Sequence, residues 1–334
     1  MAHIGIDVSK NKLDLCWLRE RGKVKTKVFT NHPKHYPALM DWLTRQTGEQ
    51  AQDLRVYLEA TSIYHEPLTE WLHEMGVQVH VVNPAQVHHY AKALGIAGKT
   101  DKKDSQLLAR YGIDRQPPRW QPEPEPVRRL RRLASRLETV QQDIQREQNR
   151  LEKARFNRDT ETASSIDLVL LALQSEAKRL REEIKDHIDG NGDLKRDQSL
   201  LESIPGIGEV TSVHLMVLLR GKPFRSARQA AAFVGLVPSE WTSGSSVRGR
   251  PSLSKKGSSA IRRRLYMAAV VASRHNPVVG AFYARLRQAG KPPMSALGAA
   301  MRKLVHIAFG VLNRQTPFQT HPAITSGGHL QVQL

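Results

Sequence analysis

The chain has 334 residues, a formal net charge of +19 and a single cysteine. This length provides for two modest domains, each with its own core. One cysteine, Cys16, excludes an internal disulfide and a thiolate metal cluster, and it fits a reducing cytoplasm. No stretch reaches the apolar length of a membrane span, and the N-terminus lacks a signal pattern. We therefore predict a cytoplasmic protein with no membrane partner, in which Cys16 is a small core residue.

The positive charge is concentrated in the last third of the chain. No Asp or Glu follows Glu240, while Lys and Arg recur fourteen times from Arg248 to Arg314. Each phosphate that such residues neutralise releases counterions, so a surface of this kind binds nucleic acid. The alternatives are a basic protein that merely stays soluble and one that lies on an anionic membrane. Nucleic acid is favoured because the basic residues lie among core-forming helical segments rather than in a tail.

The first 120 residues alternate short apolar strands with amphipathic helices. Three strands come first, with a tight Arg21-Gly22 turn between the last two, and two strands of the buried type follow. The expected strands cover residues 3–8, 12–18, 23–30, 54–59 and 77–82, and the helices between them cover residues 36–46 and 65–75. Another helix follows. This order predicts an α/β domain over residues 1–120, with a mixed sheet flanked by helices.

A proline-rich stretch, residues 117–126, marks a boundary, and beyond it the periodicity changes. Apolar residues then recur at spacings of three and four along two segments with dense alternating charge. These residues are Leu130, Leu133, Leu137, Val140, Ile144 and Leu151, then Leu173, Ala177, Leu180 and Ile184. The pattern is typical of an antiparallel or intermolecular coiled coil, and two ordinary amphipathic helices also fit it. We predict a spacer or oligomerisation arm over residues 121–198, with a loop at residues 189–193.

Residues 199–320 are predicted to form a mainly α-helical domain with one long irregular insert at residues 238–257. The tail, residues 321–334, contains turn-forming residues and little periodicity, and we expect it to be disordered. Two helices of this domain are joined through Gly206-Ile207-Gly208, which looks like a helix-hairpin-helix element. Its glycines allow backbone N–H groups and a helix N-terminus to approach a phosphate. The alternative is a simple turn between helices.

Four carboxylates are the candidate metal ligands. Asp7 interrupts an apolar strand, where a charge is costly unless a metal or another partner compensates it. Glu59 ends a second buried-type strand, at the edge of an open sheet where ligand sites form. Asp101 and Asp104 begin an amphipathic helix, and a spacing of three residues places them on one face, roughly 5–6 Å apart.

If these elements converge, the four carboxylates offer hard oxygen donors for one or two magnesium or manganese ions. Taken singly, each has an ordinary structural explanation. Asp101 then caps the helix, Asp104 complements the helix dipole and Glu59 ends a surface strand. Asp7 is the hardest to explain in this way.

The insert contains Ser243-Gly244, and a dense basic run follows it. By composition alone this segment is a flexible linker. A serine hydroxyl among guanidinium groups is, however, able to attack a phosphodiester, because those groups stabilise the charge that develops. The candidate nucleic-acid contacts are Arg248, Arg250, Lys255, Lys256, Arg262, Arg263 and Arg264. The alternative for Arg262, Arg263 and Arg264 is that they only bind the nucleic-acid backbone and do not stabilise charge at the serine.

Five motifs in chain order together resemble those of the DEDD transposases of the bacterial insertion sequence 110 family, also described as bridge-RNA-guided recombinases. The resemblance spans residues 2–318, and all five expected catalytic positions match. The motifs are Gly5-Ile6-Asp7, Glu59-Ala60-Thr61, Lys99-Thr100-Asp101 with Asp104, Ile204-Pro205-Gly206-Ile207-Gly208, and Ser243-Gly244 before Arg248-Gly249.

The resemblance implies a RuvC-like N-terminal domain with an RNase H fold, in which Asp7, Glu59, Asp101 and Asp104 bind magnesium. It implies a C-terminal transposase domain in which Ser243 forms a covalent phosphoserine link to DNA, so that strands rejoin without ATP. Dimers would pair into a tetramer through the coiled-coil arms, with each active site shared between protomers. A structured non-coding RNA would pair with donor and target DNA, so that base pairing reads the sequence.

Three other functions stay open at this point. A RuvC-like junction-resolving nuclease would use water as its nucleophile and leave Ser243 in a bystander loop. A non-catalytic nucleic-acid scaffold would tolerate neutral carboxylates, but it leaves Asp7 unexplained. Sugar kinases and actin-like ATPases also open with a Gly-Ile-Asp strand, but no second glycine-rich phosphate loop is recognisable here.

Overall fold

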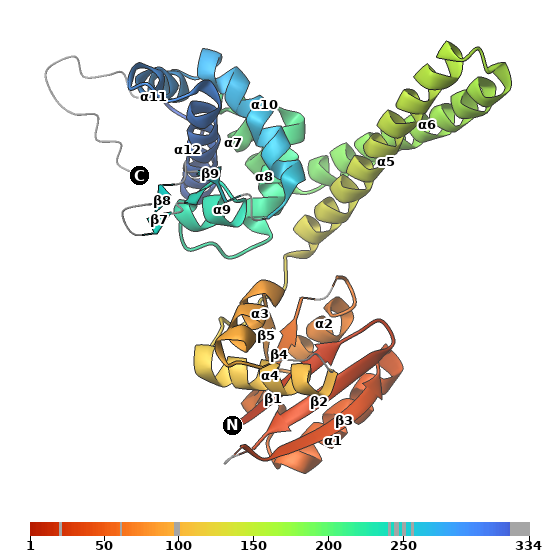
Figure 1. Ribbon diagram of the computed structural model, residues 1–334, viewed down its shortest axis with the longest axis vertical. Helices are drawn as coiled ribbons and strands as arrows, with labels where there is room; N and C mark the ends of the chain where they lie inside the picture. Colours follow the sequence, from red (N-terminus) through yellow and green to blue (C-terminus); the bar gives the residue numbers. More distant parts are fainter. Residues whose placement is uncertain are drawn as a thin grey trace, which may run out of the picture. The chain divides into compact units, whose positions relative to one another are not determined.

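The computed structural model describes residues 1–19, 22–60, 62–96, 101–239, 242–243, 247–248, 252–254 and 257–320. For residues 101, 102, 239, 242, 243, 247, 248 and 252 it describes the backbone alone. The chain divides into two compact units, Met1–Pro122 and Glu123–Leu334 (Figure 1). The division falls within the proline-rich stretch. The predicted disordered tail lies outside the described residues.

The first unit is built on a five-stranded mixed sheet, and the predicted mixed sheet is thus confirmed. Its order is β3-β2-β1-β4-β5, with β1, β4 and β5 parallel and with β2 antiparallel to both β1 and β3. The strands lie within one residue of the predicted bounds. They are β1 (Ala2–Val8), β2 (Lys12–Leu18), β3 (Val24–Thr30), β4 (Leu54–Glu59) and β5 (Gln78–Val82).

Alternation along the strands gives the sheet two different faces. On one face, apolar residues such as Ile4, Ile6 and Leu58 are fully buried under α1 (Tyr36–Thr47) and α2 (Glu66–Glu74). The opposite face packs against α3 (Pro84–Ala93) and α4 (Asp101–Arg115), so two helices follow β5 where one was expected. Figure 1 shows α4 lying along the sheet. Cys16 is fully buried, as predicted.

The two long predicted helices form an antiparallel hairpin within one chain, α5 (Glu125–Phe156) and α6 (Thr160–Asp189) (Figure 1). The residues of the predicted apolar repeat line their contact. Those that are buried are Leu130, Val140, Leu151, Ala177, Leu180 and Ile184. The predicted loop at residues 189–193 is shorter than expected, because Asn191 caps the next helix by accepting a hydrogen bond from Leu194 N at 3.0 Å.

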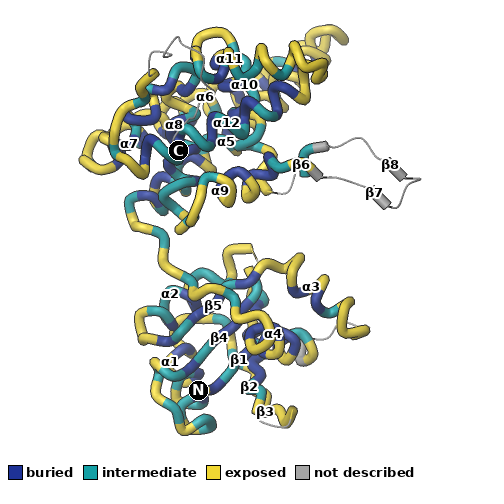
Figure 2. Tube along the Cα trace, turned by 90° about the vertical axis from the view of Figure 1, so that its left-hand side faces the viewer, coloured by how far each residue is buried: buried dark blue, intermediate teal, exposed yellow. Residues whose placement is uncertain are grey.

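The rest of the second unit is a helical cluster around its last helix. The remaining helices are α7 (Gly192–Glu202), α8 (Glu209–Arg220), α9 (Ala227–Phe233), α10 (Ser259–His275), α11 (Pro277–Gln288) and α12 (Pro293–Arg314). α12 packs against α7, α9, α10 and α11. Its buried residues run from Ala296 to Leu312, and buried residues are dark blue in Figure 2. Among the described residues, α12 alone is long and apolar enough to cross a membrane, so the expectation that no stretch reaches this apolar length is wrong for this helix. Half of that apolar window is buried inside the unit, as in the core helix of a folded domain.

The insert predicted to be irregular contains paired strands instead. Its strands are β6 (Pro238–Ser239), β7 (Thr242–Ser243), β8 (Val247–Arg248) and β9 (Ser252–Leu253). β6 pairs antiparallel with β9, and β7 pairs antiparallel with β8 in a separate two-stranded sheet. Backbone pairing of this kind needs no apolar alternation, so the composition gave no sign of it. The base is held by a hydrogen bond from Ser254 N to Val237 O at 2.9 Å.

Candidate active site

Gly5 shows how closely α4 lies on β1. A Cβ at Gly5 would stand 1.9 Å from Ser105 O and 2.6 Å from Ala109 N, both in the backbone of α4. The side-chain direction at Gly5 therefore points at α4. Side chains two residues apart in a strand point to the same face of the sheet. Asp7 consequently faces the side that α4 covers, and its side chain is partly exposed.

Glu59 lies on the same face, on the neighbouring strand. A Cβ at Gly112 of α4 would meet the Tyr57 ring at 2.4 Å, so Tyr57 points at α4, and Glu59 follows it by two residues. Ile6 and Leu58 are the last registered pair between the parallel strands β1 and β4. Asp7 and Glu59 are the next residue of each strand, at the adjacent carboxyl ends.

The other two predicted ligands lie at the N-terminal end of α4. Asp104 directly precedes Ser105, the residue whose carbonyl stands over Gly5, and the Oδ2 atom of Asp104 is shielded from solvent. Asp101 is the first residue of α4, one turn earlier, and its side chain lies outside the described residues. The fold thus brings Asp7, Glu59 and the first turns of α4 to one side of the sheet.

These residues fit a hard divalent cation by donor chemistry and placement, because each offers carboxylate oxygens from adjacent elements on one face. Among the described side chains, no three His, Cys, Asp or Glu residues come together closely enough to hold a metal ion. The three described carboxylates therefore do not form a closed cage by themselves. Whether Asp101 joins them as a fourth ligand, as the sequence pattern predicts, stays a prediction, because its side chain lies outside the described residues.

Asp14 is a further acidic residue on this face that the sequence analysis missed. It is the antiparallel register partner of Asp7, and residues directly opposite each other point to the same face. The Asp14 side chain is 13% exposed, and its Oδ2 lies 3.1 Å from the Lys12 ammonium. Like charges opposite each other repel, and Lys12 offsets part of this repulsion. Only the register between β1 and β2 reveals the pair.

The opposite end of the same sheet face holds stacked rings rather than carboxylates. Tyr57 stacks on His3 and on His80, with ring centroids 5.8 Å and 4.9 Å apart, and its hydroxyl lies 2.9 Å from His3 Nδ1. His80 Nδ1 lies 2.8 Å from the carbonyl oxygen of Pro117, to which it donates. Burial lowers the pKa of both histidines. They are therefore neutral near pH 7, and their role here is to pack this end of the sheet.

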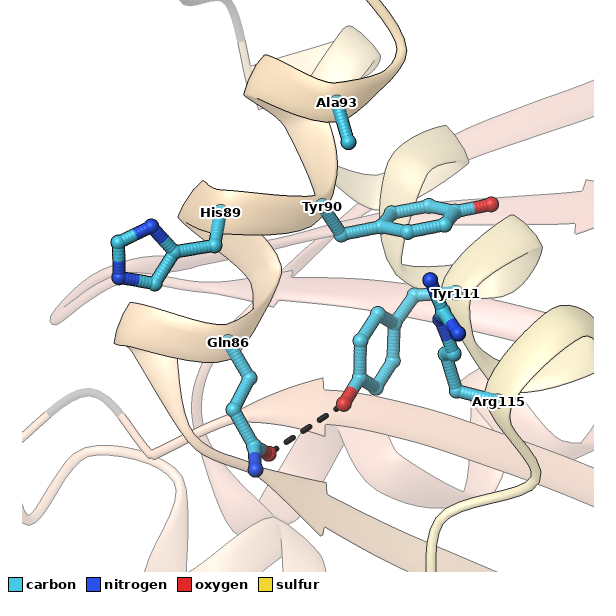
Figure 3. A pocket seen from close by; sticks show the side chains of 6 residues that line it. All are labelled: Gln86, His89, Tyr90, Ala93, Tyr111 and Arg115. Carbon is cyan, nitrogen blue, oxygen red and sulfur yellow. Dashed lines mark hydrogen bonds between the residues drawn. The ribbon is translucent and has the colours of Figure 1, made fainter. Parts of the chain in front are cut away.

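A pocket of about 290 Å³ lies in the same unit, between α3 and α4 (Figure 3). Its lining residues are Gln86, His89, Tyr90, Ala93, Tyr111 and Arg115. The Tyr111 hydroxyl donates to Gln86 Oε1 at 3.3 Å across it, and the Arg115 guanidinium lies 5.6 Å from the centre of the Tyr90 ring. None of the four predicted ligands lines this pocket, which lies toward the C-terminal end of α4, away from Asp104.

Ser243 belongs to the two-stranded sheet of β7 and β8 in the insert. Its backbone pairs with Val247, and Thr242 pairs with Arg248. The side chains of Ser243 and Arg248, and all of Arg250, Lys255 and Lys256, lie outside the described residues. The β6–β9 pair rests on α12, where a Cβ at Gly298 would stand 3.2 Å from Leu253 Cδ1.

Arg262, Arg263 and Arg264 lie in the first turns of α10 and point in three directions, since consecutive residues of a helix are about 100° apart. Arg262 donates to Val234 O at 3.1 Å and to Gly257 O at 2.9 Å, and thereby joins α10 to the end of α9. Arg264 is partly buried, and burial lowers its pKa. Arg263 is exposed. The run does not form one basic face, and Arg263 is the residue best placed for a ligand.

The two glycines of the predicted hairpin element differ in their surroundings. Gly206 has φ +100°, and a Cβ there would stand 2.7 Å from Ala272 Cβ and 2.9 Å from Ala268 O. Its lack of a side chain allows close packing against α10. Gly208 is exposed and precedes the first turn of α8, and a Cβ there would meet nothing within 4 Å. Of the two, Gly208 is open to an anion at a helix N-terminus.

Comparison with known proteins gives the family. Residues 4–154 match the family model of the DEDD transposases of insertion sequence 110, described as "Transposase", and residues 198–284 match "Transposase IS116/IS110/IS902 family". The match to the DEDD domain implies an RNase H-like fold, with which the five-stranded mixed sheet agrees.

Known relatives match along most of the chain. The chain is 33% identical over 318 residues to the pilin gene-inverting protein of Moraxella bovis, covering 95% of this chain and 97% of that protein. The equivalent protein of Moraxella lacunata matches to the same extent. It is also 24% identical over 312 residues to the transposase for insertion sequence element IS1111A of Coxiella burnetii, covering 81% of this chain and 78% of that protein. The chain therefore belongs to the insertion sequence 110 family of DEDD transposases, enzymes that cut and rejoin DNA.

Proposed function

We propose that this protein is an RNA-guided DNA recombinase that cuts and rejoins donor and target DNA through a phosphoserine intermediate. One observation carries the catalytic part of the proposal. Asp7 and Glu59, at adjacent strand ends, face the same side of the sheet as the start of α4, which carries Asp101 and Asp104. In a chain of this transposase family, such an arrangement is best explained as the phosphodiester-cleaving centre.

Asp7, Glu59, Asp101 and Asp104 are the residues that hold magnesium or manganese in this proposal. The bound ion would stabilise the negative charge that develops on the phosphate under attack. The protein's own contribution is position. Gly5 lets the backbone of α4 lie against β1, so the helix-borne carboxylates and the strand-borne carboxylates are presented from two rigid elements.

Ser243 is the proposed nucleophile. A bond forms between its Oγ and the phosphorus while one phosphorus–oxygen bond to a deoxyribose breaks, and the hydroxyl proton of Ser243 replaces that bond on the departing oxygen. Attack by a deoxyribose hydroxyl of another strand reverses these steps and releases Ser243. The ester retains the energy of the original bond, so rejoining needs no ATP.

A guide RNA and a homo-oligomer complete the proposal. Both rest on the family and on the formal net charge of +19, which suits a protein that holds two polyanions. The α5–α6 hairpin is the proposed contact between protomers, in dimers that pair into a tetramer. The product depends on how the DNA sites are arranged. Two inverted sites on one molecule give inversion, the activity for which the Moraxella relatives are named, and sites on separate molecules give insertion.

The test is denaturing electrophoresis of the protein with its co-expressed RNA, labelled donor and target DNA, and magnesium. We expect a covalent protein–DNA species and a rejoined product, both lost in Ser243→Ala with binding intact. Asp7→Asn and Asp101→Asn should lower cleavage far more than binding. Nicked DNA without an adduct would refute the serine mechanism and favour a junction-resolving nuclease that uses water. An adduct that persists in Ser243→Ala would remove this residue from the mechanism.

A further inference from the structure

A basic cluster lies on α12, apart from the basic run of the insert and of α10. His306 lies three residues after Lys303 and four after Arg302, so its side chain neighbours both of them, and the three span about 100° of the helix surface. All three are partly exposed. The other side of α12 forms the core of the second unit, with Leu304, Val305, Ala308 and Leu312 buried. The cluster is therefore held on a rigid, well-packed element.

Two neighbouring helices add charge to this cluster. α9 packs against α12 and carries Arg228, and α11 packs against α12 and carries Arg285 (Figure 1). Burial is the largest cause that lowers the pKa of His306, and Arg302, Lys303 and Arg228 lower it further. The pKa of Lys303 is likewise lowered by burial and then by Arg285. Side chains from three helices therefore act on one another as like charges.

Among the described residues, this cluster has no acidic counterpart. In the described part of the chain, no carboxylate forms an ion pair with Arg228, Arg285, Arg302 or Lys303, and no Asp or Glu occurs after Glu240. The Nε2 atom of His306 is buried and has no hydrogen-bond partner among the described residues. Partly buried like charges raise the free energy of the free protein, and an external anion would lower it.

We propose that Arg302, Lys303 and His306, with Arg228 and Arg285, bind the phosphodiester backbone of duplex DNA. Several cations spread over three helices suit a chain of phosphates, since each one neutralised releases counterions. The choice of DNA as the polyanion rests on the function proposed above. The site itself lies on α9, α11 and α12 and contains none of the proposed catalytic residues.

The experiment measures how the affinity of the full-length protein for labelled duplex DNA depends on salt, in EDTA so that no cleavage occurs. Each phosphate contact contributes about 0.9 to the slope of log affinity against log salt. We expect Arg302→Gln/Lys303→Gln to reduce that slope by about 2, and to weaken binding about 60-fold at 0.1 M salt. Lys303→Arg keeps the charge and should keep the slope.

The matched control is Arg45→Gln/Lys195→Gln on α1 and α7, which removes the same charge and lies outside the α5–α6 hairpin. Arg45 and Lys195 are 76% and 54% exposed and are already paired with Asp41 and Asp189, so their loss should leave the slope unchanged. Melting temperatures identify any misfolded variant. If the α12 variant misfolds, Arg228→Gln/Arg285→Gln, at two exposed positions, replaces it and should also lower the slope by about 2.

An unchanged slope in a folded cluster variant overturns the inference. An equal fall in the slope of the Arg45→Gln/Lys195→Gln control also overturns it, because the effect is then due to net charge. The inference is also overturned if the cluster variant binds duplex RNA or anionic vesicles more weakly while its binding to duplex DNA is unchanged. The result is independent of the catalytic proposal. If the wild-type protein forms no serine adduct but the cluster variant shows the reduced slope, this DNA site stands and the catalytic proposal fails. If the adduct forms but the slope is unchanged, only the catalytic proposal stands.

Discussion

Replacing Gly5 by alanine tests whether contact between α4 and β1 positions the carboxylates. The new Cβ would lie 1.9 Å from Ser105 O, and real Cβ contacts essentially never fall below 3.0 Å. The helix must therefore retreat by at least about 1.1 Å, and Asp104 retreats with it. Overpacking of this kind costs about 1–3 kcal/mol of stability, and a displacement of about 1 Å in an active site lowers the rate about 100-fold.

The assays are urea unfolding for stability and the rate of covalent adduct formation for activity. Gly310→Ala on α12 is the control, because a Cβ there meets nothing within 4 Å. Alanine in a helix interior should stabilise that variant by roughly 0.5–1 kcal/mol without changing the adduct rate. Wild-type stability and rate in Gly5→Ala would refute the contact, and with it the argument that places Asp104 beside Asp7.

Three further substitutions test the packing around the sites. Burial lowers the pKa of His80 below the unfolded value of about 6.5, so its contribution to stability is full above pH 6.5 and is lost as the pH falls below it. His80→Asn, which does not titrate, should lose less melting temperature between pH 7 and pH 5, and an equal loss would contradict this. Gly206→Ala combines φ +100° with a contact of 2.7 Å to Ala272, and should cost about 2 kcal/mol in urea unfolding without changing the salt slope of DNA binding. A changed slope would instead give Gly206 a phosphate contact. Arg220→Met removes the cation and the two hydrogen bonds of 2.5 and 2.7 Å that Arg220 gives to Asp197, which is 5% exposed and keeps only the bond from Gln315 Nε2 at 2.9 Å, and should cost roughly 3–5 kcal/mol. A loss below about 1 kcal/mol in urea unfolding would show that this pair is not needed for the fold.

The elements of the first unit could be predicted from local sequence because each has a strong periodic signal. Ile4 and Ile6 alternate with residues of the other face, and both are fully buried. The two long helices could be predicted for the same reason, since the repeat at three and four residues lies at the contact between α5 and α6. The insert gave no such signal. Its strands are two residues long, and pairing between backbones is independent of composition.

The basic residues illustrate the limit of a run as a guide to a surface. Arg262, Arg263 and Arg264 are consecutive, but Arg262 is occupied by two backbone carbonyls and only Arg263 is exposed. Arg228 and Lys303 are 75 positions apart in the printed sequence, yet both act on His306 because α9 packs against α12. Adjacency in sequence disperses side chains around a helix, whereas helix packing gathers distant ones.

The sequence by itself determined the kinds of element, the acid-free basic third of the chain, and the motif residues that identify the family. The tertiary structure alone decided which residues meet. In the tertiary structure Asp14 lies opposite Asp7, the backbone of α4 contacts Gly5, and Gly206 packs against α10. Periodicity within one element specifies which face a residue occupies, because that depends only on local backbone geometry. Partners across elements depend on strand register and on how closely helices approach, and these follow from packing between segments far apart in the chain.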